Sequence, residues 1–385
     1  MKVIVYTDDG KSNFGDDLNR WIWTRLLGSS PEGDDDTYLL GIGTLISKSF
    51  LPRDKQYIVL GSGVGYDAPP DDFGGPSWNV LAVRGPLTAR ALGLPAEKAV
   101  IDAAVLLRLL PECEPWPESQ RDGVVFMPHY STLAEGNWEK VCALAGVTFL
   151  NPFTESEILV QQIRRARLVI ADAMHAAIVA DALRVPWIPV VLSPISNTFK
   201  WLDWTQSLNL PYAPHYIGHS TLIESFQNFS YRYRGIRHYS SHRNVDRIIR
   251  GYRSAQRLRS WKHWRRLSYY TQFLTFRAPA RMARSRLLVW LTERINKHYT
   301  YRAARRLAKV ATLQPCLSDE KLLTSKVGRL AELLKQVAPS AAATGLGGMR
   351  GMEEKKERSR DAASPWRGPD CRLRDATREA SAANS

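Results

Sequence analysis

The sequence has few cysteines, and their spacing excludes the usual cysteine-based frameworks. The four cysteines Cys113, Cys142, Cys316 and Cys371 lie far apart and form no CxxC pair. A disulfide-rich domain or a zinc site would need closer, paired cysteines. We therefore expect reduced thiols that bind no metal.

Long apolar runs and a targeting signal are also absent. No apolar run approaches the roughly 18 residues that a membrane-spanning helix needs. The first residues, MKVIVYTDDG, lack the apolar region and the cleavage site of a secretory signal. We therefore predict a cytoplasmic protein, with a peripheral place at the inner face of the plasma membrane left open. At 44% hydrophobic and 10% aromatic residues, the chain has enough apolar side chains for a large core.

Acidic residues are scarce in one segment. The whole chain has a net charge of +15. Between Arg232 and Arg306 there are 21 basic residues and two acids, Asp246 and Glu293, which gives this segment 21 − 2 = +19. The rest of the chain therefore sums to 15 − 19 = −4. The positive charge belongs to this segment and does not explain the chemistry of the residues before it.

What the sequence does contain, up to about residue 225, is a repeated order of short apolar runs, turns and helical stretches. Continuous Val, Ile and Leu runs separated by helices are typical of parallel sheets covered on both faces. We therefore predict an α/β fold of two doubly wound, Rossmann-like domains with a cleft between them. The expected strands are 2–7, 57–60, 79–84, 123–127, 147–150, 167–171 and 186–191, and the expected helices lie at 16–27, 85–94 and 172–185, the first of them capped by Asp16.

A segment rich in Pro and Glu, 111–123, separates the two series of strands. After the second series the chain changes to long Arg-rich helical stretches, and near its end to Ala, Gly, Ser and mixed charge. We expect α/β domains at 1–112 and 121–228, a basic helical region at 229–338 and a disordered tail at 339–385.

Polar residues gather after several of the expected strands. In open α/β sheets, ligands bind at the carboxyl ends of strands, where helix N-termini present unpaired N–H groups. Cations, carboxylates and a glycine turn placed there together indicate a site for an anionic substrate that bears hydroxyl groups. The residues are Asn13, Gly15, Asp16, Asp17, Gly61, Ser62, Gly63, Arg84, Asp102, His129, Asp172 and His175.

The glycine turn and the arginine each have a second interpretation. GSGVG (61–65) resembles part of a dinucleotide fingerprint but is not GxGxxG, and a simple strand-to-helix turn explains it as well. Arg84 stands directly before a Gly-Pro helix start, where it can hold a phosphate or a carboxylate through two hydrogen bonds. The other interpretation is that it pairs with an acid, and we favour the anion.

Three further candidates also have structural alternatives. His175 lies in the first turn of an apolar helix, where it is either a core residue or an anion-facing group near the helix dipole. Asp16 is either a helix N-cap or a catalytic carboxylate. His129 follows a buried strand and has no partner that the sequence identifies.

The motifs together resemble one family. The segments NFGDDLNRWIW (13–23), GSGVG, VRGPLTARALGL (83–94), the strand around VIDAAVLL and DAMHAAIVADALRVPWIPV (172–190) look like the polysaccharide pyruvyl transferases, in particular those that form ketals in succinoglycan-type exopolysaccharide assembly. The resemblance covers about residues 1–225 and leaves out the basic segment. Ala173 and Ala176 depart mildly from the small polar residue and the glycine that are common there.

The resemblance implies a glycosyltransferase-B-like pair of α/β domains with phosphoenolpyruvate in the cleft. The enolpyruvyl unit would be moved onto two hydroxyls of one sugar, giving a pyruvate ketal and releasing phosphate. Arg84 and His175 match positions that contact the phosphoenolpyruvate anion in the family.

This chemistry also needs proton transfer, because a methylene carbon gains a proton while sugar hydroxyls lose theirs. Asp16, Asp17 and His129 are the candidates for that role or for binding sugar hydroxyls. No step requires a metal or a redox cofactor. The pairs His215/His219 and His238/His242 have helical spacing but no HExxH-type motif, so we predict no metal site there.

One further partner, an anionic membrane surface, and two other functions stay open at this point. The basic, aromatic segment 230–306 suits an anionic membrane surface, as in an enzyme that acts on lipid-linked oligosaccharides, or else forms a solvated helical layer. Nucleic acid is not expected, because no recognised binding motif accompanies the charge. The alternative functions are a glycosyltransferase that uses a nucleotide sugar and a non-catalytic membrane- or nucleic-acid-binding protein.

Overall fold

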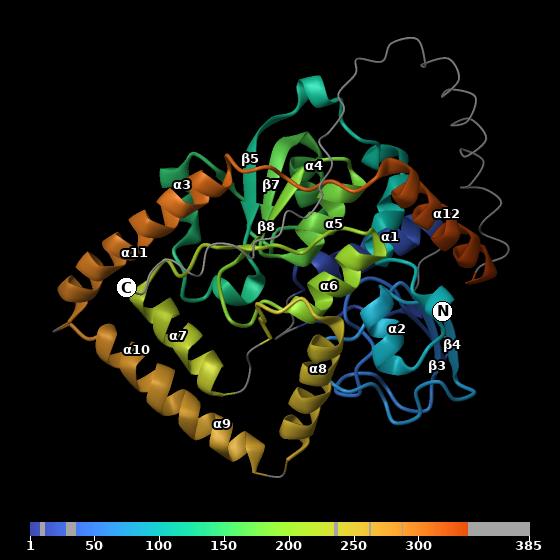
Figure 1. Cartoon of the computed structure of the whole chain (residues 1–385), viewed down its shortest axis with the longest axis horizontal. Coiled ribbons are helices and arrows are strands. Elements are labelled where there is room, and N and C mark those ends of the chain that lie inside the picture. Colours follow the sequence, from blue (N-terminus) through green and yellow to red (C-terminus); the bar gives the residue numbers. More distant parts are fainter. Residues whose placement is uncertain (8–11, 28–35, 235–237, 262, 287, 338–385) are drawn as a thin grey trace, which may run out of the picture. The chain divides into compact units, whose positions relative to one another are not determined.

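The structure is a computed structural model, and it describes residues 1–7, 12–27, 36–234, 238–261, 263–286 and 288–337 (Figure 1). The first of its two sheets has four parallel strands in the order β1-β2-β3-β4. These strands are β1 (Lys2–Val3), β2 (Thr37–Leu40), β3 (Gln56–Leu60) and β4 (Trp78–Ala82), with helices α1 (Phe14–Leu27) and α2 (Pro86–Leu92) between and after them.

The second sheet has five parallel strands in the order β6-β5-β7-β8-β9. Four helices, α3 to α6, alternate with these strands. The strands are β5 (Asp122–Met127), β6 (Thr148–Phe149), β7 (Ala166–Ala171), β8 (Trp187–Val191) and β9 (His215–Tyr216), and the helices are α3 (Trp138–Ala145), α4 (Ser156–Arg165), α5 (Met174–Ala182) and α6 (Thr198–Ser207).

The α/β class with parallel sheets is confirmed, and one predicted strand is wrong. The apolar run 100–107 forms no strand: Ala99, just before it, makes an isolated bridge with Val83, and the 3-10 helix η2 (Ala103–Leu109) begins within the run. The Asp102 carboxylate accepts a hydrogen bond from the Ala104 amide at 3.0 Å and so caps η2. Such a cap competes with strand pairing, because it satisfies backbone groups locally.

Helix starts and ends follow local signals, with one correction. Pro86 begins α2, and Gly93 ends it in a left-handed conformation with φ of 70°. Helix α1 begins at Phe14, so Asp16 is inside the first turn and is not the cap. The Asn13 side chain takes that place and accepts a hydrogen bond from the Gly15 amide at 3.1 Å.

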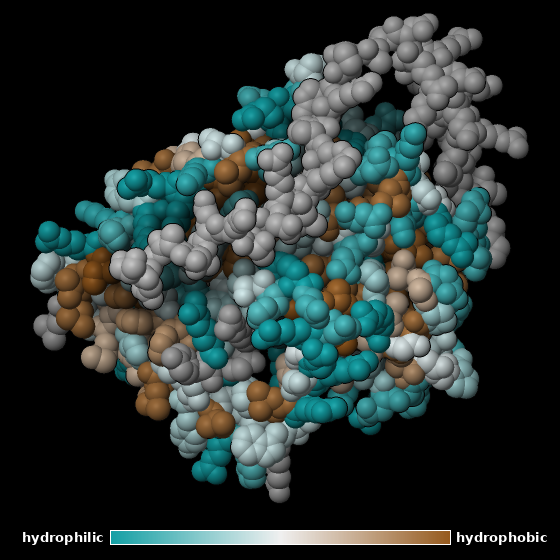
Figure 2. Space-filling view, viewed as in Figure 1, coloured by the Kyte–Doolittle hydropathy of each residue, from teal (hydrophilic) through white to brown (hydrophobic). Residues whose placement is uncertain are grey.

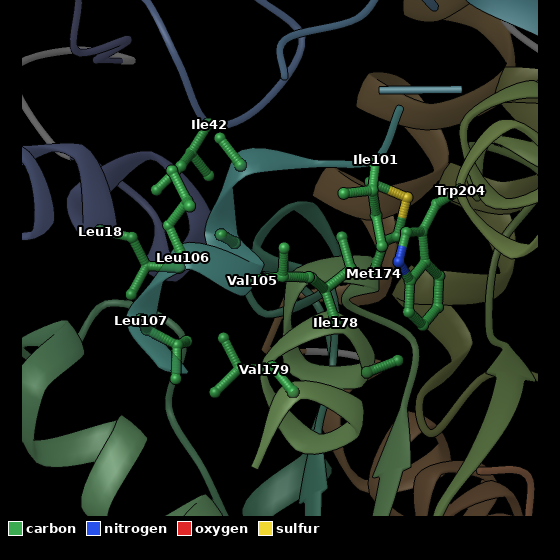
Figure 3. Close-up of a cluster of buried hydrophobic side chains, with 14 of the residues drawn as sticks. Leu18, Ile42, Ile101, Val105, Leu106, Leu107, Met174, Ile178, Val179 and Trp204 are labelled. Atoms are coloured by element: carbon green, nitrogen blue, oxygen red, sulfur yellow. The ribbon is translucent and has the colours of Figure 1, made fainter. Parts of the chain in front are cut away.

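The main apolar core is shared by elements of both sheets. Figure 3 shows part of it, where Leu18 of α1, Val105 of η2 and Ile178 of α5 belong to one cluster of buried side chains. Every residue of α5 is buried, which explains why this helix is apolar on all sides. The described residues fall within one compact unit, so the predicted division at 112 and 121 stays a prediction.

Helices make up the basic region. Helix α11 packs against α3 beside the second sheet, whereas α12 returns to η2, β3 and β4 of the first (Figure 1). No helix among the described residues is both long and apolar enough to cross a membrane. The tail predicted at 339–385 lies outside the described residues. The helices are α7 (Leu222–Tyr233), α8 (Val245–Ser260), α9 (Trp264–Gln272), the π-helix η6 (Phe273–Arg277), α10 (Ala278–Ala283), α11 (Val289–Val310) and α12 (Glu320–Val337).

Candidate active site

A cavity of about 300 Å³ lies where loops from both sheets meet. Its wall includes residues that follow β5, β7 and β8 of the second sheet and residues at the start of α1. The structure thus brings together half of the residues expected at strand ends. Those that line the cavity are Asn13, Gly15, Asp16, His129, Asp172 and His175.

Three helix N-termini converge on this cavity. Residues of the first turn of α1, of α5 and of α6 line it, including Gly15, Met174 and Lys200. At the start of α6, the Asn197 side chain accepts a hydrogen bond from the Lys200 amide at 3.2 Å. Helix N-termini carry a partial positive charge, and at α5 no side chain caps the first amides. Their convergence makes the cavity suited to an anion.

Lys200 adds a full positive charge that the sequence interpretation missed. Its ammonium lies 4.8 Å from the centre of the Tyr66 ring and 3.4 Å from the Tyr66 hydroxyl, and it forms no salt bridge with any described residue. Gly65 is needed nearby, because a Cβ there would lie 2.7 Å from the Lys200 side chain. The signal was present: Lys200 follows β8 as His175 follows β7, so the same strand-end rule finds it.

His175, which lines the cavity, lies close to Asp102, which is not part of the lining. The His175 Nε2 and Asp102 Oδ2 atoms are 3.6 Å apart, and neither has a hydrogen-bond partner among the described residues. Asp102 is fully buried and the His175 side chain is 11% exposed. Gly15 allows the imidazole to lie there, since a Cβ on Gly15 would come within 2.0 Å of His175 Nδ1. At 3.6 Å the Asp102 carboxylate faces the imidazole across a gap that is too long for a hydrogen bond.

Two carboxylates in the cavity have raised pKa values. Burial raises the pKa of Asp16 to about 6, although His175, Lys200 and a hydrogen bond from Asn13 act in the opposite direction. Burial likewise raises the pKa of Asp172 to about 6. Carboxyl groups with such values exchange protons near neutral pH, as catalytic acids and bases must.

His129 is held in a neutral form by its surroundings. Burial, helped by the charge of Lys200, lowers the pKa of His129 to about 3. Its Nδ1 lies 2.8 Å from the Ser131 hydroxyl, and its amide donates to Asp172 Oδ2 at 3.0 Å. Ser196 donates to the other oxygen of Asp172 at 2.9 Å, so this carboxylate ties the end of β5 to the loop after β8.

Arg84 lies behind the cavity wall. Its side chain is fully buried and pairs with Asp203 at 2.9 Å. It also donates to the Thr44 hydroxyl at 3.1 Å and to the Val64 carbonyl at 2.5 Å, while Asp203 accepts from the Thr88 amide at 2.9 Å. In this structure Arg84 pairs with an acid, and its contact with a substrate anion stays a prediction. A direct contact with a ligand would require this network to open.

The other predicted residues outside the cavity lining have structural partners. Asp17 accepts from the amide and the hydroxyl of Ser156, at 3.1 and 2.8 Å, and so joins α1 to the start of α4. Gly61 has φ of 91°, and Ser62 accepts from the Leu45 amide at 3.0 Å. Gly63 leaves space for the arginine, because a Cβ there would lie 2.6 Å from the Arg84 guanidinium. GSGVG is thus a packing turn.

The histidines that are paired by spacing in the sequence differ in their position relative to the cavity. His238 lines the cavity and shares a hydrogen bond of 2.9 Å with Arg259, whereas His215 and His219 do not line it. Burial and the Arg259 charge lower the pKa of His238 to about 3. Among the described residues, no group of three or more His, Cys, Asp and Glu side chains is arranged to hold a metal ion.

Comparison with known proteins gives two matches. The polysaccharide pyruvyl transferase family model matches residues 114–194. The succinoglycan biosynthesis protein ExoV of Rhizobium meliloti (strain 1021) is 38% identical over 220 residues, which cover 57% of this chain and 69% of that protein. No solved structure matches the chain significantly.

The region matched by the family model supplies part of the cavity lining. Residues 114–194 supply His129, Asp172 and His175, whereas Asn13 and Asp16 lie before that range, at the start of α1. The identity to the Rhizobium protein extends over most of that protein's length. The chain therefore belongs to the polysaccharide pyruvyl transferase family and is a transferase.

Proposed function

We propose that this protein moves the enolpyruvyl unit of phosphoenolpyruvate onto two hydroxyls of one sugar, forming a cyclic pyruvate ketal in exopolysaccharide biosynthesis. Membership of the family supports pyruvyl transfer, and the name of the Rhizobium relative supports the exopolysaccharide setting. The observation that carries the choice of donor is the convergence of three helix N-termini and Lys200 on one cavity.

Phosphoenolpyruvate has two anionic groups, a phosphate and a carboxylate. Helix N-termini bind such groups through backbone N–H, and a lysine adds a point charge suited to phosphate. The cavity volume of about 300 Å³ is at the lower end of the range for ligand sites, which is roughly 300–1,000 Å³. Phosphoenolpyruvate is small enough for this space.

The proposed reaction is balanced without an added cofactor. The methylene carbon takes a proton and becomes a methyl group, while one sugar hydroxyl adds to C2 and loses its proton. The C2–O bond to phosphate then breaks, and the phosphate leaves with the electron pair. The second hydroxyl adds to the resulting cation and loses its proton to close the ketal ring. We propose no metal and no redox cofactor for these steps.

Asp16 is the proposed proton donor to the methylene carbon. Because its pKa is raised to about 6, a useful fraction of this carboxyl group carries a proton near neutral pH. His175, backed by Asp102 at 3.6 Å, is the proposed acceptor of a hydroxyl proton. His129 stays neutral and offers its free ring nitrogen for a hydrogen bond to substrate.

The acceptor sugar is proposed to bind at one side of the cavity lined by loops of the first sheet. There Ser49 donates to Asp67 at 2.8 Å, and the rings of Tyr6 and Phe50 lie 5.2 Å apart. A carboxylate beside aromatic rings offers hydroxyl groups and apolar sugar faces their respective partners. An oligosaccharide on a lipid carrier is the proposed acceptor.

The glycosyltransferase-B-like arrangement of two domains is also part of the proposal. It is supported by the two parallel sheets, by a cavity lined from both and by the return of α12 to the first sheet. We further propose that the protein works in the cytoplasm, where phosphoenolpyruvate is made.

Thermal unfolding with and without phosphoenolpyruvate tests the donor. A ligand at a hundred times its dissociation constant stabilises a protein by about 2.7 kcal/mol, which raises the unfolding midpoint measurably. Inorganic phosphate and a nucleoside diphosphate at the same concentration are the controls. A midpoint shift with phosphoenolpyruvate that phosphate does not reproduce is expected. A shift with the nucleotide alone would replace the proposal by a glycosyltransferase.

A further inference from the structure

Exposed apolar residues concentrate in one segment of the chain. Nineteen large hydrophobic residues are exposed in the described part of the chain, and twelve of them lie between Leu258 and Leu291. This segment, which we call the 258–291 surface, covers the end of α8, then α9, η6 and α10, and the start of α11. Figure 2 shows hydrophobic residues gathered where α10 meets α11. Patches of this kind mark interaction sites.

The orientation of the helix explains the patch. The segment from α9 to α10 packs on α7. The residues that it buries are small: Ser268 accepts a hydrogen bond from Arg234 at 3.0 Å, and Ala280 and Ala283 are 2% and 6% exposed. Its outward residues are large, with Leu274 at 69% and Met282 at 63% exposed. This is the reverse of the pattern of a helix that meets only water on its outer face.

Positive charge accompanies these apolar residues, and negative charge does not. The sequence contains no acid between Asp246 and Glu293. Among the described residues of the surface, Arg266 and Arg277 lie over the rings of Tyr270 and Tyr269, at 6.0 and 5.5 Å. Neither these two arginines nor the exposed Arg281 and Arg286 pair with a carboxylate of the described chain. Their charge is therefore available to an outside partner.

We infer that the 258–291 surface docks on an anionic lipid membrane, with its arginines at the headgroups and its apolar side chains in the outer acyl region. Trp290, at 63% exposed, and the paired tyrosines are residues favoured at such an interface. The inference is independent of the proposed reaction.

Two other occupants fit less well. Nucleic acid offers stacking partners to tyrosine and tryptophan but no apolar environment for Leu274, Met282 or Leu291. A second copy of the chain would bring the same arginines face to face in a symmetric interface, where like charges repel. An anionic lipid surface satisfies the charge and the apolar area together.

Vesicle sedimentation with the full chain tests the inference. The probes are vesicles of pure phosphatidylcholine and vesicles in which part of the lipid is phosphatidylglycerol. We expect the chain to sediment with the anionic vesicles and much less with the neutral ones. Each arginine near the surface should contribute about fivefold in binding, the equivalent of about 1 kcal/mol. Vesicles with brominated acyl chains should also quench tryptophan fluorescence, and Trp290→Phe should reduce this quenching.

Two variants separate the contributions of charge and apolar contact. Arg266→Gln, Arg277→Gln, Arg281→Gln and Arg286→Gln together should weaken binding by well over tenfold, and so should Leu267→Ser, Leu274→Ser, Met282→Ser and Trp290→Ser together. The matched charge control neutralises exposed Arg53, Lys140, Arg167 and Arg329, and the matched apolar control changes exposed Leu144, Ile158 and Leu317 to Ser. The controls should bind as the wild type does, and all four variants should keep the wild-type unfolding midpoint.

Three results would overturn the inference. One is equal sedimentation with neutral and anionic vesicles, or sedimentation that the surface variants leave unchanged. Another is a dimer at micromolar concentration that the apolar surface variant alone dissociates, without any vesicle binding. The last is retention on single-stranded RNA together with failure to sediment with lipid.

Discussion

The strand ends of the two sheets carry similar kinds of residue, yet they become different kinds of site. After β4 of the first sheet, Arg84 is fully buried and pairs with Asp203. After β7 and β8 of the second sheet, His175 and Lys200 face a cavity, each in the first turn of a helix. An arginine before a helix start and a histidine within one are equally good anion-binding signals. The difference is the buried carboxylate that meets Arg84.

This comparison shows that a cation at a strand end is only half of an anion site. The other half is the absence of a nearer carboxylate, which depends on residues far away in the sequence. Asp203 lies 119 residues beyond Arg84. The comparison assigns a role in stability to the Arg84–Asp203 pair and a role in binding to the cavity. Predictions that separate these two roles therefore test it directly.

The largest effect is expected from Arg84→Ala. Removing the guanidinium leaves Asp203 buried without its counterion, so the free energy of unfolding should fall by about 3–5 kcal/mol. Arg90→Ala is the control, because Arg90 forms an exposed salt bridge with Asp246 and should cost less than about 1 kcal/mol. Urea denaturation measures both. A fully stable Arg84→Ala protein that fails to bind phosphoenolpyruvate would restore the anion clamp and erase the contrast.

Lys200→Met should have the opposite profile. Loss of a charged contact to the donor costs about 1.5–3 kcal/mol, or roughly 10- to 100-fold in phosphoenolpyruvate affinity, with little change in unfolding free energy. Isothermal titration calorimetry measures the affinity. Lys140→Met, on the exposed face of α3, is the matched control and should bind normally. Unchanged affinity in Lys200→Met would remove this lysine from the donor site.

Two glycines sharpen the comparison, because a methyl group at each would clash with the side chain beside it. In Gly63→Ala the Cβ would lie 2.6 Å from the Arg84 guanidinium, so we expect a loss of about 1–3 kcal/mol of stability. In Gly15→Ala it would displace the His175 imidazole, which borders the cavity and has space to turn. Turnover should fall at least tenfold there, with a smaller loss of stability. Equal stability losses with equal turnover would contradict the assignment.

The smallest effect is a pH dependence. The pKa of His238 is lowered to about 3 in the folded protein, against about 6.5 in the unfolded chain. Below pH 6.5 the unfolded chain takes up a proton that the folded protein does not, so stability falls as the pH drops. His238→Gln keeps an acceptor for Arg259. Between pH 6.5 and 5, its free energy of unfolding should fall by about 1–2 kcal/mol less than that of the wild type. Parallel stability curves for the two proteins would show that His238 does not titrate in this way.

The two carboxyl groups with raised pKa values do not interfere with that measurement. Asp16 and Asp172, each with a pKa of about 6, hold a proton in the folded state above the pH at which the unfolded chain has lost it. Their contribution to stability therefore falls as the pH rises from about 4 to 6, opposite to that of His238. Because both carboxyl groups are present in the wild type and in His238→Gln, their effect cancels in the difference.

The sequence alone determined the α/β class, the parallel strands and the cluster of strand-end residues in the second half. These follow from local signals: continuous apolar runs, Pro86 and Gly93 at the ends of α2, and His175 in the first turn of α5. Such signals act over a few residues, so they can be recognised in the sequence alone. The comparisons with known proteins confirmed that the motifs resemble those of the pyruvyl transferases.

Only the tertiary structure decided which of these residues share a cavity. It paired Arg84 with Asp203, turned GSGVG into a packing turn, and replaced the expected strand at 100–107 by a capped 3-10 helix. It also placed Lys200 and His238 beside His129, and faced large apolar residues of α9 and α10 outward. Burial and pairing are long-range properties, because they depend on which segments pack together. A residue's type sets what it can bind, and its packed neighbours set whether it is still available to do so.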